Sequence, residues 1–280
     1  MDGSVPSSDR DASQPYAIVA GSEKGGTGKS TTAMHLAVAL LKAGFQVGCI
    51  DLDSRQASLS GYIDNRARFA AETGRSLSIP RHCRIEPSGL GDPAEALAEN
   101  ESRFEAALAE MAGCQFVIID APGQDSPLSR LGHYHADTLV TPLNDSFLDI
   151  AVLAVLDCRN RQVLAPSHYS QMVWEQNNLR IVNGKQPVDW IVMRNRLTHI
   201  EARNKREIAD LLVLLGQRLG FRPAAGLGER VIYRELYYQG LTALDIAEDA
   251  PGGTLTGSQQ AACREVLDLL KVIGLGEPVA

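Results

Sequence analysis

Short, fully apolar runs alternate along the chain with longer segments of helix-forming composition. The apolar runs predict buried strands at residues 16–20, 46–50, 115–120, 136–142 and 188–193. The longer segments predict helices at 30–43, 55–73, 93–112, 147–157, 200–218 and 258–273. Strands that are apolar on both faces and alternate with helices indicate an α/β fold, a mostly parallel twisted sheet with helices on both faces.

Residues 15–280 are expected to form a single domain. The polar residues 1–14 have no apolar core of a signal peptide and are expected to be a disordered tail. Residues 159–187 have little periodicity and are expected to form an insertion. No run reaches the roughly 18 apolar residues of a membrane span. His133 and His135 are expected to lie at the surface, without a metal.

Composition narrows the class of protein. Of 280 residues, 44% are hydrophobic and 22% charged, which is typical of a soluble globular protein. The five cysteines form no C-x-x-C pair, which favours a reducing cytosol over a disulfide framework or a zinc site. The formal net charge of −7 means that any contact with nucleic acid requires a local basic patch.

The first predicted strand leads directly into Lys24-Gly-Gly-Thr-Gly-Lys-Ser30. A strand, a glycine-rich turn and a helix form a phosphate-binding loop, in which backbone N–H groups and the helix N-terminus face the phosphates of a nucleoside triphosphate. Lys29 is expected to reach the terminal phosphates and the Ser30 hydroxyl to bind Mg²⁺. The predicted nucleotide contacts are Gly25, Gly26, Thr27, Gly28, Lys29, Ser30 and Thr31.

The loop departs from the general pattern G-x-x-x-x-G-K-[ST], because Glu23 stands where the first glycine is expected. With Lys24 added, it resembles the deviant Walker A loop of the family that includes ParA and MinD. The resemblance implies that Lys24 crosses to the phosphates of a partner subunit, so that two subunits enclose two nucleotides. The alternative is that Lys24 only adds local positive charge.

Carboxylates follow two of the predicted strands. Asp51 and Asp53 end the second strand, and Asp120 ends the 115–120 strand; in a parallel sheet these ends converge on the phosphate loop. The resemblance implies that Asp53 orients the attacking water and that Asp51 and Asp120 hold Mg²⁺ through its water shell. It also implies that Pro122 and Gly123 belong to switch II. The alternative role for Asp53 is a helix N-cap.

Asn195 follows the strand that ends at Met193. It matches the asparagine that reads adenine in related ATPases, which implies ATP as the nucleotide; a plain turn residue is the alternative. No arginine finger is evident, so slow hydrolysis is expected. Slow turnover suits a switch in which ATP favours a dimer and hydrolysis releases it.

Residues 194–222 carry seven basic and three acidic side chains, a local charge of +4 that leaves −11 for the remainder. A local basic face predicts sequence-independent, salt-sensitive binding of DNA. The candidate DNA-binding residues are Arg194, Arg203, Lys205, Arg206, Arg218, Arg222 and Arg230. The alternative is a solvated helix with ion pairs such as Arg203–Glu207. The polar face of the 258–273 helix has no net charge, which argues against a membrane tether.

Further segments resemble the MipZ family of division-plane ATPases. They are Ile50-Asp-Leu-Asp53, Thr141-Pro-Leu-Asn-Asp-Ser-Phe147, Arg194-Asn-Arg-Leu197, Glu201-Ala-Arg-Asn-Lys-Arg206 and Val231-Ile-Tyr-Arg-Glu-Leu236. The resemblance implies a cytoplasmic, nucleoid-associated ATPase whose ATP-bound homodimer binds DNA and inhibits FtsZ assembly, and which is recruited by ParB. A ParA-type partition ATPase and, less well supported, a metabolic P-loop synthetase are the alternatives.

Overall fold

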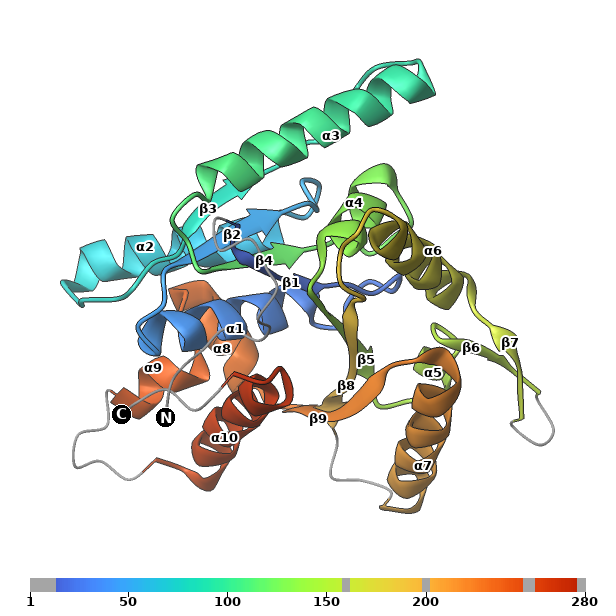
Figure 1. The fold of residues 1–280 in the computed structure, drawn as a ribbon. Helices are drawn as coiled ribbons and strands as arrows, with labels where there is room; N and C mark the ends of the chain where they lie inside the picture. The colour runs from blue at the N-terminus through green and yellow to red at the C-terminus, as the bar shows by residue number, and fades with distance from the viewer. Residues whose placement is uncertain (1–13, 158–161, 198–201, 249–254, 276–280) are drawn as a thin grey trace.

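A computed structural model describes residues 14–157, 162–197, 202–248 and 255–275. Seven parallel strands form one sheet in the order β3-β2-β4-β1-β5-β8-β9, with β1 at its centre (Figure 1). Their bounds are β1 Tyr16–Ala20, β2 Val47–Asp51, β3 Arg81–Arg84, β4 Phe116–Asp120, β5 Thr138–Asn144, β8 Asp189–Leu197 and β9 Arg222–Gly228. A separate antiparallel hairpin consists of β6 Ala154–Leu156 and β7 Val163–Pro166.

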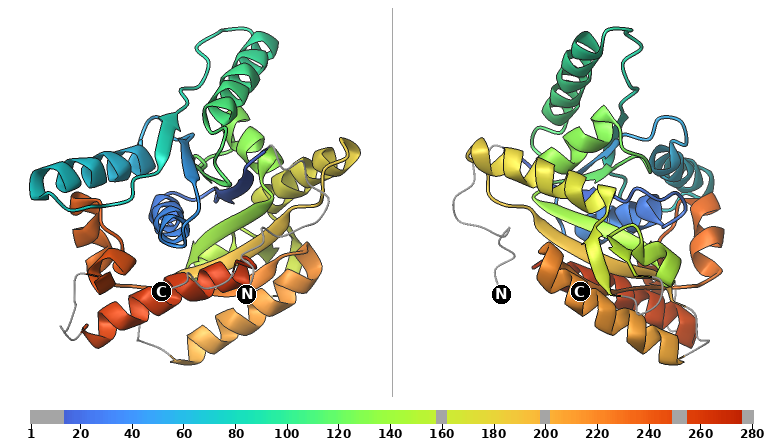
Figure 2. Two further views of the ribbon diagram at one scale, coloured as in Figure 1. Left: turned by 60° about the vertical axis from the view of Figure 1, so that its left-hand side comes forward. Right: turned by 90° about the vertical axis from the view of Figure 1, so that its right-hand side faces the viewer.

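Helices cover both faces of the sheet (Figures 1 and 2). One group consists of α1 Lys29–Lys42, α2 Ser58–Thr73, α8 Ile232–Gln239, α9 Ala243–Glu248 and α10 Gly257–Val272. The other consists of α3 Pro93–Glu110, α4 Pro127–His135, α6 His168–Val182 and α7 Ala202–Leu219, and a short helix, α5 Phe147–Ile150, follows β5. Alternate residues of β1 enter opposite cores: Ile18 belongs to the same core as Leu36 of α1, and Val19 to the same core as Phe104 of α3.

The predicted α/β fold is confirmed, and the five predicted strands agree with β1, β2, β4, β5 and β8 to within a few residues. The predicted helix at 147–157 is wrong. Ser146 caps α5, but the helix ends at Ile150 and the chain then enters the β6–β7 hairpin. The described part of the segment expected as an insertion contains β7 and α6, and α6 packs against α4.

Some predictions concern residues outside the described part, namely the tail at 1–13 and Cys158. The cysteines at 49, 83, 114 and 263 are free thiols. No helix within the described ranges is long and apolar enough to cross a membrane.

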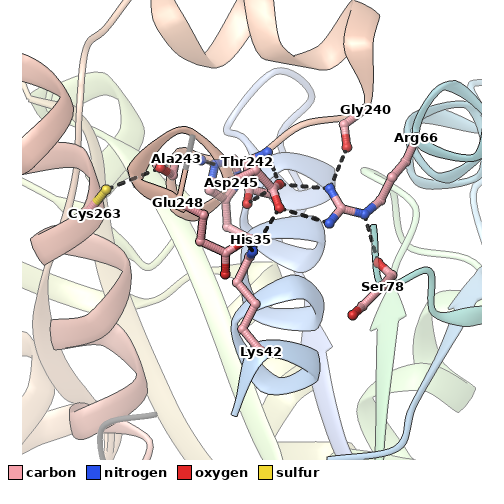
Figure 3. A network of polar contacts seen from close by, with 10 residues as sticks. All are labelled: His35, Lys42, Arg66, Ser78, Gly240, Thr242, Ala243, Asp245, Glu248 and Cys263. Atoms are coloured by element: carbon pink, nitrogen blue, oxygen red, sulfur yellow. Dashed lines mark hydrogen bonds and ion pairs between the residues drawn. The ribbon is translucent and has the colours of Figure 1, made fainter. Parts of the chain in front are cut away.

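A buried ionic cluster attaches the C-terminal helices to α1 and α2 (Figure 3). Arg66 of α2 is fully buried and donates to both carboxylate oxygens of Asp245, at 2.7 and 2.9 Å, and to the carbonyls of Ser78 and Gly240. Thr242 donates to Asp245 through its backbone N–H and its hydroxyl. These bonds hold the pKa of Asp245 below its usual range although burial alone would raise it. The cluster thereby fixes α8 and α9 against α1 and α2.

Candidate active site

The glycine-rich loop connects β1 to α1 at the carboxyl edge of the sheet. Gly26 and Gly28 have φ angles of 73° and 93°, a left-handed conformation that glycine adopts without strain. Lys29 opens α1, is buried, and donates from its Nζ to the carbonyl of Lys24 at 3.2 Å. The loop therefore curls around its own lysine, with its glycines lining the cavity in front of it.

This cavity has a volume of about 230 Å³. Its lining includes predicted nucleotide contacts, namely Gly25, Gly26, Gly28, Lys29, Ser30 and Thr31, and the predicted carboxylates Asp53 and Asp120. The structure therefore brings most of the predicted site together. Six further lining residues were not among the predicted site residues, namely Gln56, Ser58, Tyr62, Ala121, Arg196 and Tyr237. Of these, Arg196 has an unusual φ of 52° and presents an arginine to a cavity for which the sequence suggested no arginine finger.

Charges at the base of the cavity are only partly balanced. Burial lowers the pKa of Lys29, against the raising effect of Asp120 and Asp53. Burial and the nearby Asp51 raise the pKa of Asp120 to about 7, although a hydrogen bond from Ser30 and the charge of Lys29 oppose this. Among the described residues, Oδ1 of Asp120 has no hydrogen-bond partner. A buried carboxylate oxygen without a partner is costly unless a ligand completes it.

Magnesium fits these residues. Mg²⁺ prefers carboxylate and hydroxyl oxygens and retains several waters, and Ser30 and the open oxygen of Asp120 supply such donors beside the phosphate loop. Asp51 differs, because its oxygens already accept from the N–H of Asp53 at 3.0 Å and from the N–H and hydroxyl of Ser60 at 2.9 and 3.0 Å. Asp51 therefore supports the segment that carries Asp53.

Asp53 lies at the side of the cavity. Its Oδ1 accepts from the N–H of Gln56 at 3.2 Å, which closes a turn before α2. The helix itself begins at Ser58 after Ala57, whose φ is 45°. Asp53 thus closes a local turn and is not the cap of α2, while its half-buried carboxylate remains within the cavity lining.

Lys24 is paired within its own chain. Its Nζ lies 2.8 Å from Oδ1 of Asp149 in α5, and its side chain is 43% exposed. Asp149 is also bonded to Ser146, the cap of α5. The pair places an accessible ammonium at the outer rim of the phosphate loop.

Asn195 of β8 holds the phosphate loop in place through its side-chain amide. Its Nδ2 donates to the carbonyl of Thr27 at 2.5 Å, and its Oδ1 accepts from the N–H of Arg196 at 2.9 Å. A Cβ on Gly28 would lie 2.1 Å from this Nδ2, so only glycine fits. The adenine-reading role of Asn195 stays a prediction, because both ends of its amide contact backbone here.

The segment predicted to be switch II approaches the loop closely. A Cβ on Gly123 would lie 3.1 Å from Nζ of Lys29 and 3.5 Å from the backbone of Gly25. Pro122 before it is buried. The segment therefore passes next to the position where the terminal phosphates are expected.

His133 is not a surface residue, contrary to the expectation. It is 3% exposed, because it packs under Gly21 and contacts the Tyr169 hydroxyl at 3.1 Å. Burial lowers the pKa of His133 to about 4 and that of half-buried His135 to about 3. Both imidazoles are therefore neutral at pH 7 and serve packing.

The predicted DNA-binding residues do not form one patch. Three of them are paired: Arg194 with Asp145 at 2.6 Å, Arg222 with Asp189 at 2.6 Å and Arg230 with Glu265 at 2.5 Å. Because α7 runs back from the carboxyl end of β8 to the start of β9, Arg206 lies towards the nucleotide edge and Arg218 at the opposite edge. Arg206 is exposed; the side chains of Arg203 and Lys205 lie outside the described residues.

Residues 16–277 match the model of a protein family described as ATPase MipZ. No curated protein matches the sequence. Among solved structures, the complex of a Cyanothece McdA variant with ATP has a TM-score of 0.62 at 18% identity, covering 96% of this chain and 100% of that one.

Two more solved structures are similar. A putative plasmid partition protein from Borrelia burgdorferi B31, bound to AMPPNP, has a TM-score of 0.55 at 17% identity and covers 92% of this chain and 98% of its own. The cell division ATPase MinD of Pyrococcus furiosus has a TM-score of 0.54 at 15% identity and covers 92% and 99%. At these identities the likeness establishes a shared fold.

Proposed function

This chain belongs to the MipZ family of ATPases, and we propose that it is an ATP-dependent dimerisation switch that binds DNA without sequence preference and sets the division site by inhibiting FtsZ assembly. The observation that carries the proposal is the incomplete charge cluster of Lys29, Ser30 and Asp120 beneath the phosphate loop. The complexes of McdA with ATP and of the partition protein with AMPPNP support ATP as the ligand.

In this mechanism Lys29 and the loop N–H groups bind the terminal phosphates, while Ser30 and Asp120 hold Mg²⁺. Bound Mg²⁺ would neutralise phosphate charge during transfer. Asp53 orients the attacking water, and Gly123 lets switch II follow the terminal phosphate. Asp51 keeps Asp53 in place through its N–H. Slow hydrolysis is also part of the proposal. Because Arg196 lines the cavity, where an arginine finger would accelerate hydrolysis, the single-turnover rate tests this part directly.

The position of Lys24 supports the proposed dimerisation. Its exposed ammonium lies at the outer rim of the loop, so in the dimer it leaves Asp149 for the phosphates bound by the partner subunit. The N-terminal half of α7 lies at the same edge of the sheet, so a dimer formed there doubles its basic residues. A second set of basic residues matters for DNA binding, because three of the candidate arginines in each subunit are already paired with carboxylates. ParB, which is proposed to recruit the monomer, completes the cycle.

The test is the variant Asp53→Ala, sized by light scattering with Mg-ATP and with Mg-ADP. Loss of the water-orienting carboxylate is expected to trap a dimer with ATP and to leave a monomer with ADP. The control Asp268→Ala changes an exposed carboxylate on α10 and is expected to behave as the original chain. A monomer of Asp53→Ala at saturating ATP would contradict the switch.

The trapped dimer then distinguishes a division-site regulator from a partition ATPase. It is expected to bind duplex DNA of any sequence and to shorten FtsZ polymers. Adding Arg206→Ala is expected to weaken DNA binding several-fold, whereas Arg218→Ala on the same helix is not, because it lies at the other edge. A dimer that binds DNA but leaves FtsZ unchanged would instead identify a partition ATPase.

A further inference from the structure

A groove separate from the nucleotide cavity runs over α4, between α3 and α6 (Figure 1). It has a volume of about 610 Å³ and shares no lining residue with the nucleotide cavity. In Figures 1 and 2, α3 projects away from the body of the molecule, and α4 lies between it and α6. The groove therefore lies over α4, on the side where α3 projects away from the rest of the molecule.

Apolar side chains line this groove from all three helices. Leu97 of α3 is 43% exposed and Leu179 of α6 is 49% exposed, and Leu131 of α4 lies between them. Phe104 is almost fully buried and also lines the groove, and its ring centroid lies 4.7 Å from that of His135. Since burial keeps His135 neutral, as its lowered pKa of about 3 indicates, the part of the floor formed by Phe104, Leu131 and His135 is uncharged and can accept apolar side chains.

One wall of the groove is acidic. Glu101 and Glu105 follow Leu97 on the same face of α3 and line the groove. Neither carboxylate has an ion-pair partner within 4.0 Å among the described residues. Helix α3 as a whole has five glutamates and one arginine. The acidic wall therefore keeps its negative charge available to a partner.

The basic residues near the groove do not cancel this wall. Arg130, which lines the floor, is paired with Asp125 at 2.7 Å and with Glu175 at 2.8 Å. Lys185 lies at the end formed by α6, with its Nζ 4.7 Å from the Tyr134 ring centroid. The charge of the groove is thus asymmetric, because the α3 wall is negative, Arg130 is offset by two carboxylates and Lys185 adds positive charge beside α4.

We propose that this groove is a docking site for a basic amphipathic helix of a partner protein. Leucine-sized residues at i, i+3, i+4 and i+7 would cover the floor, and lysines or arginines on the adjacent flank would face Glu101 and Glu105. Charge also argues against a second copy of this chain, because the acidic wall would then face a chain whose formal net charge is −7.

The experiment measures fluorescence anisotropy of a designed, labelled peptide of roughly five helical turns, with leucines at this spacing and lysines elsewhere. A comparator peptide has glutamates in place of the lysines. No nucleotide is present, so the result does not depend on the proposed ATPase cycle. The lysine peptide is expected to bind and the glutamate peptide not to bind.

Charge reversal is the decisive variant. Glu101→Lys with Glu105→Lys is expected to weaken the lysine peptide at least about tenfold and to create binding of the glutamate peptide. Glu95→Lys with Glu110→Lys makes the same change of net charge on the same helix outside the groove, and is expected to leave the affinity within about twofold.

The apolar floor has its own variant. Leu97→Ser with Leu179→Ser changes two partly exposed side chains, so the fold is retained while peptide affinity falls. Equal weakening by the two charge-reversal pairs would overturn the proposal, since the peptide would then sense only net charge. Concentration-dependent self-association that Leu97→Ser with Leu179→Ser abolishes, without peptide binding to the original chain, would overturn it too and assign the groove to a second copy instead.

Discussion

Two clusters of charged residues lie near α1, and they differ in how completely they are satisfied. In the buried ionic cluster, Arg66 and Asp245 form two hydrogen bonds with each other, and carbonyls and N–H groups take up their remaining hydrogen-bonding capacity. At the phosphate loop, Asp120 keeps an oxygen without a partner among the described residues, and Lys29 donates to a carbonyl of its own loop. A cluster complete in itself holds the fold together, whereas an incomplete one is suited to a ligand.

The largest expected effect breaks the complete cluster. Arg66→Met would leave Asp245 buried with only Lys42 and Thr242 as partners, and we expect the free energy of unfolding to fall by about 3–5 kcal/mol. Urea denaturation measures it. Arg68→Met, on the exposed side of the same helix, is the control and should change stability by less than about 0.5 kcal/mol. Equal stability of the two variants would mean that the buried pair is not structural.

A smaller effect of opposite sign is expected at the incomplete cluster. The pKa of Asp120 in the folded protein is raised to about 7. Its contribution to the free energy of unfolding is therefore fully present below the unfolded pKa of about 4 and is lost as pH rises through 7. Asp120→Asn should therefore stabilise the nucleotide-free protein at pH 8 by on the order of 2–4 kcal/mol and flatten its stability between about pH 4 and 7. Thermal unfolding across this range, with Asp53→Asn as control, measures both.

The same variant should lose Mg-dependent ATP binding, which calorimetry would show. A gain of stability together with a loss of binding is what separates a ligand site from a structural one. If Asp120→Asn were destabilising at pH 8, the comparison of the two clusters would be wrong.

The smallest effect concerns the support of Asp53. Ser60→Ala removes the hydroxyl that donates to Asp51 but keeps the N–H of residue 60, so we expect a loss of about 1 kcal/mol in unfolding free energy. Thr73→Ala, at the exposed end of the same helix and outside the nucleotide cavity, is the control. A single-turnover ATPase rate reduced only in the variant at position 60 would show that Asp51 positions Asp53.

The central strands were predictable because they are apolar throughout, as in the run that became β4. The edge strands were not: β3 reads Arg-His-Cys-Arg and β9 contains proline and two glycines, so neither has a strand pattern. The false helix at 147–157 arose because a short apolar run fits a helix and a strand equally well, and only the hairpin partner at 163–166 decides between them.

The phosphate site was predictable for a topological reason. Parallel strands place their carboxyl ends at one edge, so Lys29 and Asp120 had to meet there. The pairs Lys24–Asp149 and Arg66–Asp245 had no such signal. Their members lie in segments that share no motif, and which lysine or arginine each buried aspartate contacts depends on how the loops pack.

The contact between Gly28 and Asn195 also restricts how this sequence can diverge. Any side chain at position 28 would strike the amide that holds the Thr27 carbonyl, and a shorter residue at 195 would release that carbonyl. Neither position can change alone without cost to the loop. Two sites far apart in the chain are therefore held fixed together, because the φ of 93° strains any side chain at position 28 whatever residue stands at 195.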